Sequence, residues 1–169
     1  VTHDKELQFD PDVLSRFIDA ASAVSARSGC LLVQFPPGLS TEYLDRVENI
    51  LGNIEMVIDK NQWQVAVEFR SMGWYSPDVY HLLKSYGATL VRHDMPKSRT
   101  PDVVLSDVIY LRMHGPTGNY RGSYEEHALG DLAGIIHEWL SEGKTVFVYF
   151  NNTAGDAFNN LRSLQTLLH

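Results

Sequence analysis

Hydrophobic positions along the chain follow two alternating patterns. Apolar residues three and four positions apart predict amphipathic helices. These helices are predicted to begin at Asp10-Pro11, Ser40 and Ser76-Pro77, to run from about Tyr124 to Glu142, and to include Leu161–Leu168, with a weak helical turn at Pro101–Leu105. Short apolar runs between them predict five strands, at Leu31–Phe35, Gln64–Arg70, Ala88–His93, Val108–Met113 and Thr145–Phe150.

Helical crossovers separate the predicted strands, an order typical of a parallel sheet. Side chains along each strand alternate between an apolar face and a face that turns polar toward the carboxyl end. In Gln64–Arg70, for example, Val67 and Phe69 oppose Glu68 and Arg70. An open doubly wound sheet needs two apolar faces, whereas a barrel can have a polar lumen at its carboxyl mouth. The pattern therefore favours an α/β, TIM-barrel-like (β/α) fold with flanking helices.

The length of the chain bears on how complete this barrel is. A (β/α)8 barrel typically takes ~250 residues. A chain of 169 residues with five strands therefore predicts a truncated barrel whose N-terminal strands are missing. The start at Val1-Thr2-His3, without an initiator methionine, favours the same interpretation. We expect one barrel-like domain over residues 1–169, with unpaired outer strand edges that favour self-association.

Composition narrows the set of partners and compartments. The chain has 21 acidic and 14 basic residues and a formal net charge of -7, which argues against nucleic acids and anionic membrane surfaces as partners. No apolar run approaches the ~20 residues that span a bilayer, and no signal peptide opens the sequence. The single cysteine, Cys30, excludes an intrachain disulfide and a cysteine-rich zinc site. We expect a soluble, cytoplasmic protein.

Polar residues near the carboxyl ends of the predicted strands form the candidate site. Glu68 and Arg70 share a strand face, and Arg112 and His114 repeat this spacing two strands later. A carboxylate can act as a base, histidine transfers protons near neutral pH, and arginine binds anions. Parallel strands end on one side of a sheet, so we expect one polar cluster there, made of Gln34, Glu68, Arg70, Asp94, Arg112, His114, Tyr149 and Asn151.

These residues also have structural interpretations. Burying carboxylates and arginines together is costly unless they pair, so we expect Glu68 or Asp94 within hydrogen-bonding reach of Arg70 or Arg112. Such an ion pair can be purely structural, and hydrogen bonds in the lumen can equally hold His114. His93, next to Asp94 in the sequence, is predicted to point away from the polar face and to be structural.

Two further residues lie beyond the strand ends. Trp74 follows the Glu68 strand and either stacks on a ligand or covers the barrel mouth. Asn152 follows the last strand and either binds a polyol or hydrogen-bonds to the backbone of a turn. A divalent metal on Glu68, Asp94 and His114 stays open, but the sequence has no closely spaced ligand motif. No metal site is therefore assigned, and the cofactor stays unknown.

Several motifs occur in a fixed order over nearly the whole chain. They are Gln34–Pro37, Val67–Arg70 with Trp74, His93–Pro96, Tyr110–Pro116, Tyr120 with Gly122 and Tyr124, and Tyr149–Asn152 followed by Gly155, Ala157 and Asn160. The set resembles the DUF72 (YecE-like, UPF0759) family, with the chain similar to the C-terminal two-thirds of its domain and Thr2-His3 similar to its T-H motif. The chain departs from the family pattern at Ser71, where His is common, and at Thr153, where Asp is common.

The resemblance implies a TIM-barrel-like fold but no reaction, because the role of the family is not established. The residues themselves favour an enzyme that acts on a small polar, anionic or sugar-like molecule by acid/base chemistry, as a hydrolase or an isomerase. Predicted catalytic residues are Glu68, Asp94 and His114, and predicted substrate-binding residues are Gln34, Arg70, Trp74, Arg112, Tyr149, Asn151 and Asn152. The alternative is a non-catalytic small-molecule-binding or regulatory barrel. An open, polar mouth favours catalysis, and a saturated network plugged by aromatic rings favours binding or stability.

Overall fold

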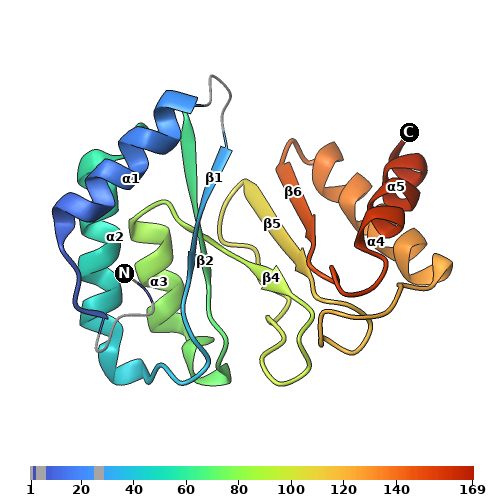
Figure 1. The fold of residues 1–169 in the computed structure, drawn as a ribbon, viewed down its shortest axis with the longest axis horizontal. Coiled ribbons are helices and arrows are strands. Elements are labelled where there is room, and N and C mark those ends of the chain that lie inside the picture. Colours follow the sequence, from blue (N-terminus) through green and yellow to red (C-terminus); the bar gives the residue numbers. More distant parts are fainter. Residues whose placement is uncertain (1, 3–6, 25–28) are drawn as a thin grey trace. The chain divides into compact units, whose positions relative to one another are not determined.

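The computed structural model describes residue 2, residues 7–24 and residues 29–169, so His3 of the predicted T-H motif lies outside the described residues. The chain forms two compact units, residues 1–90 and residues 91–169. Each unit contains a three-stranded sheet with helices beside it (Figure 1), and all strand pairs are parallel. The predicted α/β class with parallel strands and flanking helices is confirmed. Within the described residues, each sheet is open rather than closed into a barrel.

Residues 1–90 fold around the sheet β1-β2-β3. The elements in chain order are α1 (Pro11–Val24), β1 (Gly29–Gln34), the 3-10 helix η2 (Thr41–Tyr43), α2 (Leu44–Val57), β2 (Trp63–Glu68), the 3-10 helix η3 (Met72–Trp74), α3 (Pro77–Ser85) and β3 (Thr89–Leu90). Gln34 and Glu68 are partners at the carboxyl end of the β1–β2 ladder. This register places Gln34 and Glu68, two residues of the candidate site, side by side.

Local sequence signals explain where the helices of this unit begin. The Ser40 hydroxyl accepts a hydrogen bond from the Glu42 amide at 3.3 Å, just before α2. The Ser76 hydroxyl accepts one from the Val79 amide at 3.5 Å, with Pro77 at the first helical position. Helix α2 buries the apolar positions that its spacing predicts, which are Val47, Ile50, Leu51 and Ile54. The predicted starts of both helices are confirmed to within a few residues.

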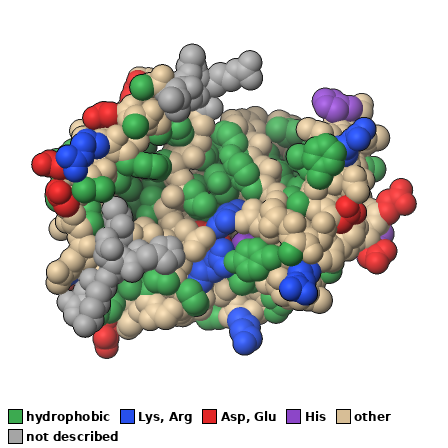
Figure 2. Space-filling model, viewed as in Figure 1, with side chains coloured by type: hydrophobic (Ala, Val, Ile, Leu, Met, Phe, Trp, Pro, Cys, Tyr) green, Lys and Arg blue, Asp and Glu red, His purple; other side chains and the backbone are tan. Residues whose placement is uncertain are grey.

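Helix α1 is covered on one side only. It buries Leu14 and Ile18 but leaves Val13 and Phe17 exposed. Figure 2 shows hydrophobic side chains at the surface on the α1 side of this unit. Scattered apolar side chains at a surface are ordinary in folded proteins.

Residues 91–169 fold around the sheet β4-β5-β6. The elements are β4 (Arg92–His93), β5 (Val108–Met113), α4 (Glu126–Ser141), β6 (Thr145–Phe150) and α5 (Ala157–Leu168). One face of the sheet packs against α4 and α5 in a core that contains Ile109, Leu111, Val146, Val148, Ile136, Trp139 and Leu164. The other face carries the alternate positions of β5 and β6, including Arg112 and Tyr149. The predicted division into an apolar and a polar strand face is confirmed in this unit.

The prediction of one strand over Ala88–His93 is wrong. The structure has β3, paired with β2, and β4, paired with β5, with Val91 between them. The Thr100 hydroxyl donates to the Val91 carbonyl oxygen at 2.9 Å and accepts from the His93 amide at 3.2 Å. A side chain distant in sequence thus takes backbone groups that a continuous strand would use in its ladder.

Other element boundaries differ less. Strand β1 begins at Gly29 and ends at Gln34, and β2 ends at Glu68 rather than Arg70, whereas β5 and β6 have their predicted bounds. The helical turn predicted at Pro101–Leu105 is wrong, because this segment is non-helical. The Val103 amide bonds instead to the Pro101 carbonyl oxygen at 2.8 Å, which is a tighter turn than a helix makes.

Candidate functional site

Gln34, Glu68 and Arg70 form a polar cluster in residues 1–90. Arg70 Nε lies 2.7 Å from Glu68 Oε1, and Arg70 Nη2 donates to Gln34 Oε1 at 3.3 Å. The Glu68 side chain is fully buried, and that of Arg70 is 8% exposed. A buried carboxylate is costly unless a cation compensates its charge, which the guanidinium does here. The predicted pairing of a site carboxylate with a site arginine is confirmed.

Trp74 packs in the interior of the same unit. Its ring stacks on that of Phe69 with centroids 4.5 Å apart, and Phe69 stacks on Phe35 at 5.3 Å. The indole Nε1 donates to the Leu39 carbonyl oxygen at 2.9 Å, and the residue is buried. These contacts give Trp74 a packing role, and they satisfy its one polar atom.

A carboxylate–histidine pair lies in residues 91–169, where Asp94 follows β4 and His114 follows β5. Asp94 Oδ1 accepts the His114 backbone N–H at 2.8 Å and lies 3.3 Å from His114 Nδ1. The same oxygen therefore holds both the backbone and the ring of His114, which is fully buried. Two of the residues predicted to be catalytic are thus in direct contact.

Tyr124 completes this arrangement. Its hydroxyl donates to Asp94 Oδ2 and accepts the Gly115 backbone N–H at 2.6 Å. Burial alone would raise the pKa of Asp94, but hydrogen bonds from His114 and Tyr124 outweigh it and hold that pKa below its usual range. Burial and the neighbouring Asp94 carboxylate raise the pKa of Tyr124. At neutral pH, Asp94 is therefore ionised and Tyr124 keeps its proton.

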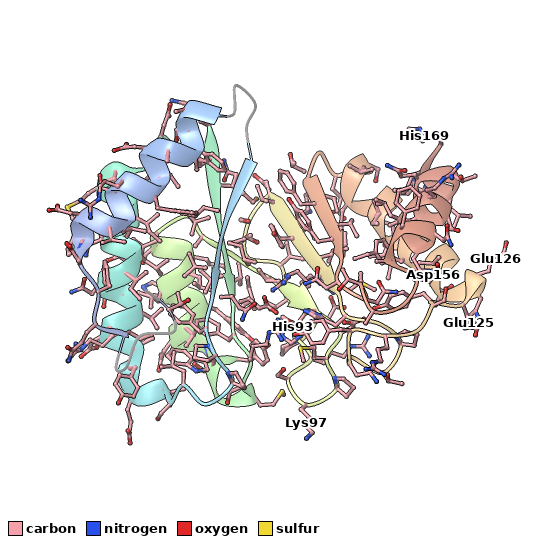
Figure 3. The ribbon with its side chains drawn as sticks, viewed as in Figure 1. His93, Lys97, Glu125, Glu126, Asp156 and His169 are labelled. Carbon is pink, nitrogen blue, oxygen red and sulfur yellow. The ribbon has the colours of Figure 1, made fainter. Side chains whose placement is uncertain are left out.

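The prediction that His93 points away from the polar face is wrong. Strand β4 pairs with β5 so that His93 is opposite Arg112, and Arg92 is opposite Leu111. Partners in a ladder share a face, so His93 lies on the polar side, at the end of β4 (Figure 3), and its ring meets that of His114 edge-on at 5.8 Å. Arg92 lies on the apolar side instead, because its guanidinium covers the Trp139 ring at 5.0 Å.

Arg112, Tyr149 and Asn151 form a further polar group in residues 91–169. Arg112 and Tyr149 are partners in the β5–β6 ladder, and Asn151 follows β6. With the Asn151 amide oriented so that its oxygen faces Arg112, this oxygen accepts a hydrogen bond from Arg112 Nε at 3.1 Å. The Tyr149 ring stacks on Tyr110 at 4.8 Å and is 42% exposed. Of these three residues, Tyr149 is the most exposed.

Asn152 is buried and joins two loops of this unit to α5. Its amide nitrogen donates to the Gly122 carbonyl oxygen and to Asn160 Oδ1, each at 2.9 Å. Asn160 Nδ2 donates in turn to the Ser123 hydroxyl at 2.9 Å. Asp156, at the start of α5 (Figure 3), accepts from the same hydroxyl at 3.1 Å. These bonds are of the backbone and turn type that was the alternative to ligand binding by Asn152.

Residues 1–169 match the protein family described as a protein of unknown function, DUF72. The chain belongs to the DUF72 family. A DUF72 family protein from Thermotoga maritima is 24% identical, with a TM-score of 0.65 over 92% of this chain and 62% of that one. A DUF72 family protein from Enterococcus faecalis is 23% identical, with a TM-score of 0.75 over 95% of this chain and 69% of that one. A comparison with proteins of curated function gave no match.

Membership of DUF72 confirms the family resemblance, and the two solved structures support the fold. The chain covers 62% of the Thermotoga maritima protein, so it spans less than two thirds of that length. In the described part of this DUF72 chain, no group of three or more His, Cys, Asp or Glu side chains is placed to hold a metal ion. None of the described helices is long and apolar enough to cross a membrane.

This DUF72 protein thus presents eight of its ten predicted site residues in three groups. Residues 1–90 contain the first group, which is Gln34, Glu68 and Arg70. Residues 91–169 contain the other two, which are the pair Asp94 and His114, and the group Arg112, Tyr149 and Asn151. Sequence reasoning missed Tyr124 as a member of the site. The available signals were its place in the ordered series of motifs and at the end of a glycine-rich loop that starts at His114.

Proposed function

We propose that this DUF72 protein is an enzyme that acts on a small polar, anionic or sugar-like molecule by acid/base chemistry. The observation that carries the proposal is the Asp94–His114 pair, with Oδ1 3.3 Å from Nδ1. A neutral imidazole with its proton on Nδ1 has its lone pair on Nε2, which can take a proton from a substrate and return it. The Asp94 carboxylate stabilises the imidazolium formed in between.

We further infer that both units belong to one TIM-barrel-like domain. Parallel strand pairing in both units, helices against the apolar sheet face of residues 91–169 and the similarity to two solved DUF72 structures support this inference. Glu68 would supply a second acid/base group. Arg70 and Arg112 would bind negative charge, and Gln34, Tyr149 and Asn151 would orient substrate hydroxyls.

A turnover screen tests the proposed activity. The panel comprises p-nitrophenyl phosphate, acetate and glycosides for hydrolysis, and sugar phosphates in D2O for proton exchange followed by NMR. We expect turnover of at least one substrate, and we expect His114→Gln to lower kcat/KM by about 10²–10⁴-fold, as loss of a general acid/base does. His137→Gln, on an exposed position of α4, is the matched control. Equal turnover by the His114→Gln and His137→Gln variants would contradict the assignment.

A non-catalytic small-molecule-binding protein is the second candidate. The closely paired Glu68 and Arg70 and the buried stack of Phe35, Phe69 and Trp74 favour it, because a compensated carboxylate and a packed aromatic cluster suit stability or binding more than catalysis. Calorimetric titration with inorganic phosphate and citrate distinguishes the two candidates. Binding that depends on Arg112, together with no turnover on the whole panel, supports the binding protein over the enzyme.

A further inference from the structure

Tyr124 is the point at which the loop after β5 returns to the Asp94–His114 pair. The loop folds back on its own start, because the Tyr120 amide donates to the His114 carbonyl oxygen at 2.7 Å. Gly115 has a φ of +98°, and a Cβ there would collide with the Arg121 carbonyl oxygen. Glycine is therefore required at the residue whose backbone N–H donates to the Tyr124 hydroxyl. The loop backbone delivers that donor to a defined place.

The hydrogen bonds around Asp94 have a fixed direction. An ionised carboxylate only accepts, so the Tyr124 hydroxyl must donate its proton to Asp94 Oδ2. The same hydroxyl accepts the Gly115 N–H on its oxygen. Asp94 Oδ1 accepts the His114 amide at 2.8 Å. Each carboxylate oxygen is thus held by a different donor, and rotation of the carboxylate would break at least one of these bonds.

We propose that Tyr124 is a positioning residue that acts through Asp94 to fix the tautomer of His114. Because Oδ1 only accepts and lies 3.3 Å from Nδ1, the proton of a neutral His114 is held on Nδ1 and the lone pair on Nε2. Loss of the Tyr124 hydroxyl frees Oδ2, lets the carboxylate turn, and weakens this preference. The transfer of a proton between Nε2 and a substrate rests on the proposed function, whereas the tautomer of His114 does not.

Other groups also face the His114 ring. The Tyr120 ring meets it edge-on at 5.2 Å from the loop, and the His93 ring meets it at 5.8 Å from β4. Tyr120→Phe is therefore a matched control for Tyr124→Phe. Both variants remove one hydroxyl group from the same loop and keep the aromatic ring. Of the two tyrosines, only Tyr124 donates a hydrogen bond to Asp94.

Long-range proton–nitrogen NMR spectra of the ¹⁵N-labelled chain test this proposal, at a pH where the imidazole is neutral. We expect the His114 ring proton on Nδ1. In Tyr124→Phe, we expect the ratio of the two tautomers to move toward Nε2–H by roughly fivefold to tenfold, the effect of one hydrogen bond of ordinary strength. We expect the ratio in Tyr120→Phe to equal that of the parent chain, and backbone amide spectra to show that both variants are folded.

A His114 proton on Nε2 in the parent chain would overturn the proposal, and so would an unchanged ratio in folded Tyr124→Phe. If Tyr124→Phe does not fold, Asp94→Asn takes its place, and an unchanged ratio in that variant overturns the proposal equally. The tautomer is measured without any substrate. A failed turnover screen therefore leaves this result intact, and an unchanged ratio alongside His114-dependent turnover removes only the role of Tyr124.

Discussion

The two units of the chain hold their site carboxylates in different ways. In residues 1–90, Glu68 is paired with Arg70, a cation that keeps its proton at every pH a protein experiences. In residues 91–169, Asp94 is held by the Tyr124 hydroxyl, the His114 amide and the His114 ring. The first arrangement pairs a carboxylate with a permanent cation, and the second surrounds a carboxylate with hydroxyl, amide and imidazole groups. The two carboxylates thus have different partners, since Glu68 pairs with an arginine two positions further along the chain and Asp94 pairs with a histidine twenty positions further along.

Burial sharpens this contrast. The Glu68 side chain is fully buried, whereas that of Asp94 is 21% exposed. Removing a partner should therefore cost more stability in residues 1–90 than in residues 91–169. Cys30, in β1, offers a way to see where the cost falls. Burial raises the pKa of its half-buried thiol to about 12, so a thiol reagent should react with it slowly at neutral pH in the folded chain and faster when β1 opens.

The largest effect is expected for Glu68→Gln. The change leaves the Arg70 charge buried without its carboxylate, which typically costs about 3–5 kcal/mol in the free energy of unfolding. Urea denaturation measures this loss, and the reaction of Cys30 with a thiol reagent should become faster. Glu55→Gln is the control, because the Glu55–Lys60 pair is exposed and such pairs contribute at most about 1 kcal/mol. Equal losses in both variants would mean that the Glu68–Arg70 pair does not stabilise the fold.

A smaller effect is expected for Asn152→Ala. The change removes the donor to the Gly122 carbonyl oxygen and to Asn160 Oδ1, and two buried hydrogen bonds contribute about 2 kcal/mol. These bonds all lie within residues 91–169, so we expect Cys30 to react as slowly as in the parent chain. Asn159→Ala, which loses only an exposed bond to Asp156, is the control. Faster reaction of Cys30 in Asn152→Ala would show that the two units open together.

Sequence reasoning succeeded where local pattern decides the structure. Strands β5 and β6 have their predicted bounds because their alternation is continuous, and the helix start at Ser76-Pro77 follows from cap chemistry alone. It failed where a distant side chain decides. The residues around Val91 do not show that the Thr100 hydroxyl will donate a hydrogen bond to the Val91 carbonyl oxygen and so interrupt the strand.

The candidate site shows the same division between local and distant causes. Strand alternation correctly grouped Glu68 with Arg70, because Arg70 follows only two residues after Glu68, the last residue of β2. The partnership of Asp94 with Tyr124 depends on how the loop after β5 returns, which Gly115 and its positive φ help to set. The sequence left two roles for Trp74, ligand stacking and packing. Its burial depends on the rings of Phe35 and Phe69, which follow two different strands.

The smallest effect is expected for Asp94, and it should depend on pH. A carboxylate whose pKa is lower in the folded chain contributes stability that is fully present above its ordinary pKa of ~3.9 and is lost as the pH falls through the folded value. Asp94→Asn should therefore lower the free energy of unfolding at pH 7 by about 1 kcal/mol, the effect of a charge-assisted hydrogen bond reduced to a neutral one. Below the folded pKa, the difference between the variant and the parent chain should shrink, because the parent carboxyl is then neutral as well.

Urea denaturation from pH 7 down to acid measures this difference in the free energy of unfolding. Asp102→Asn is the control, since the Asp102 side chain is 90% exposed beside Arg92. A difference that stays constant with pH would show that the donors around Asp94 do not favour its ionised form, and Asp94 would then resemble a structural acceptor more than the partner of a proton-transferring histidine.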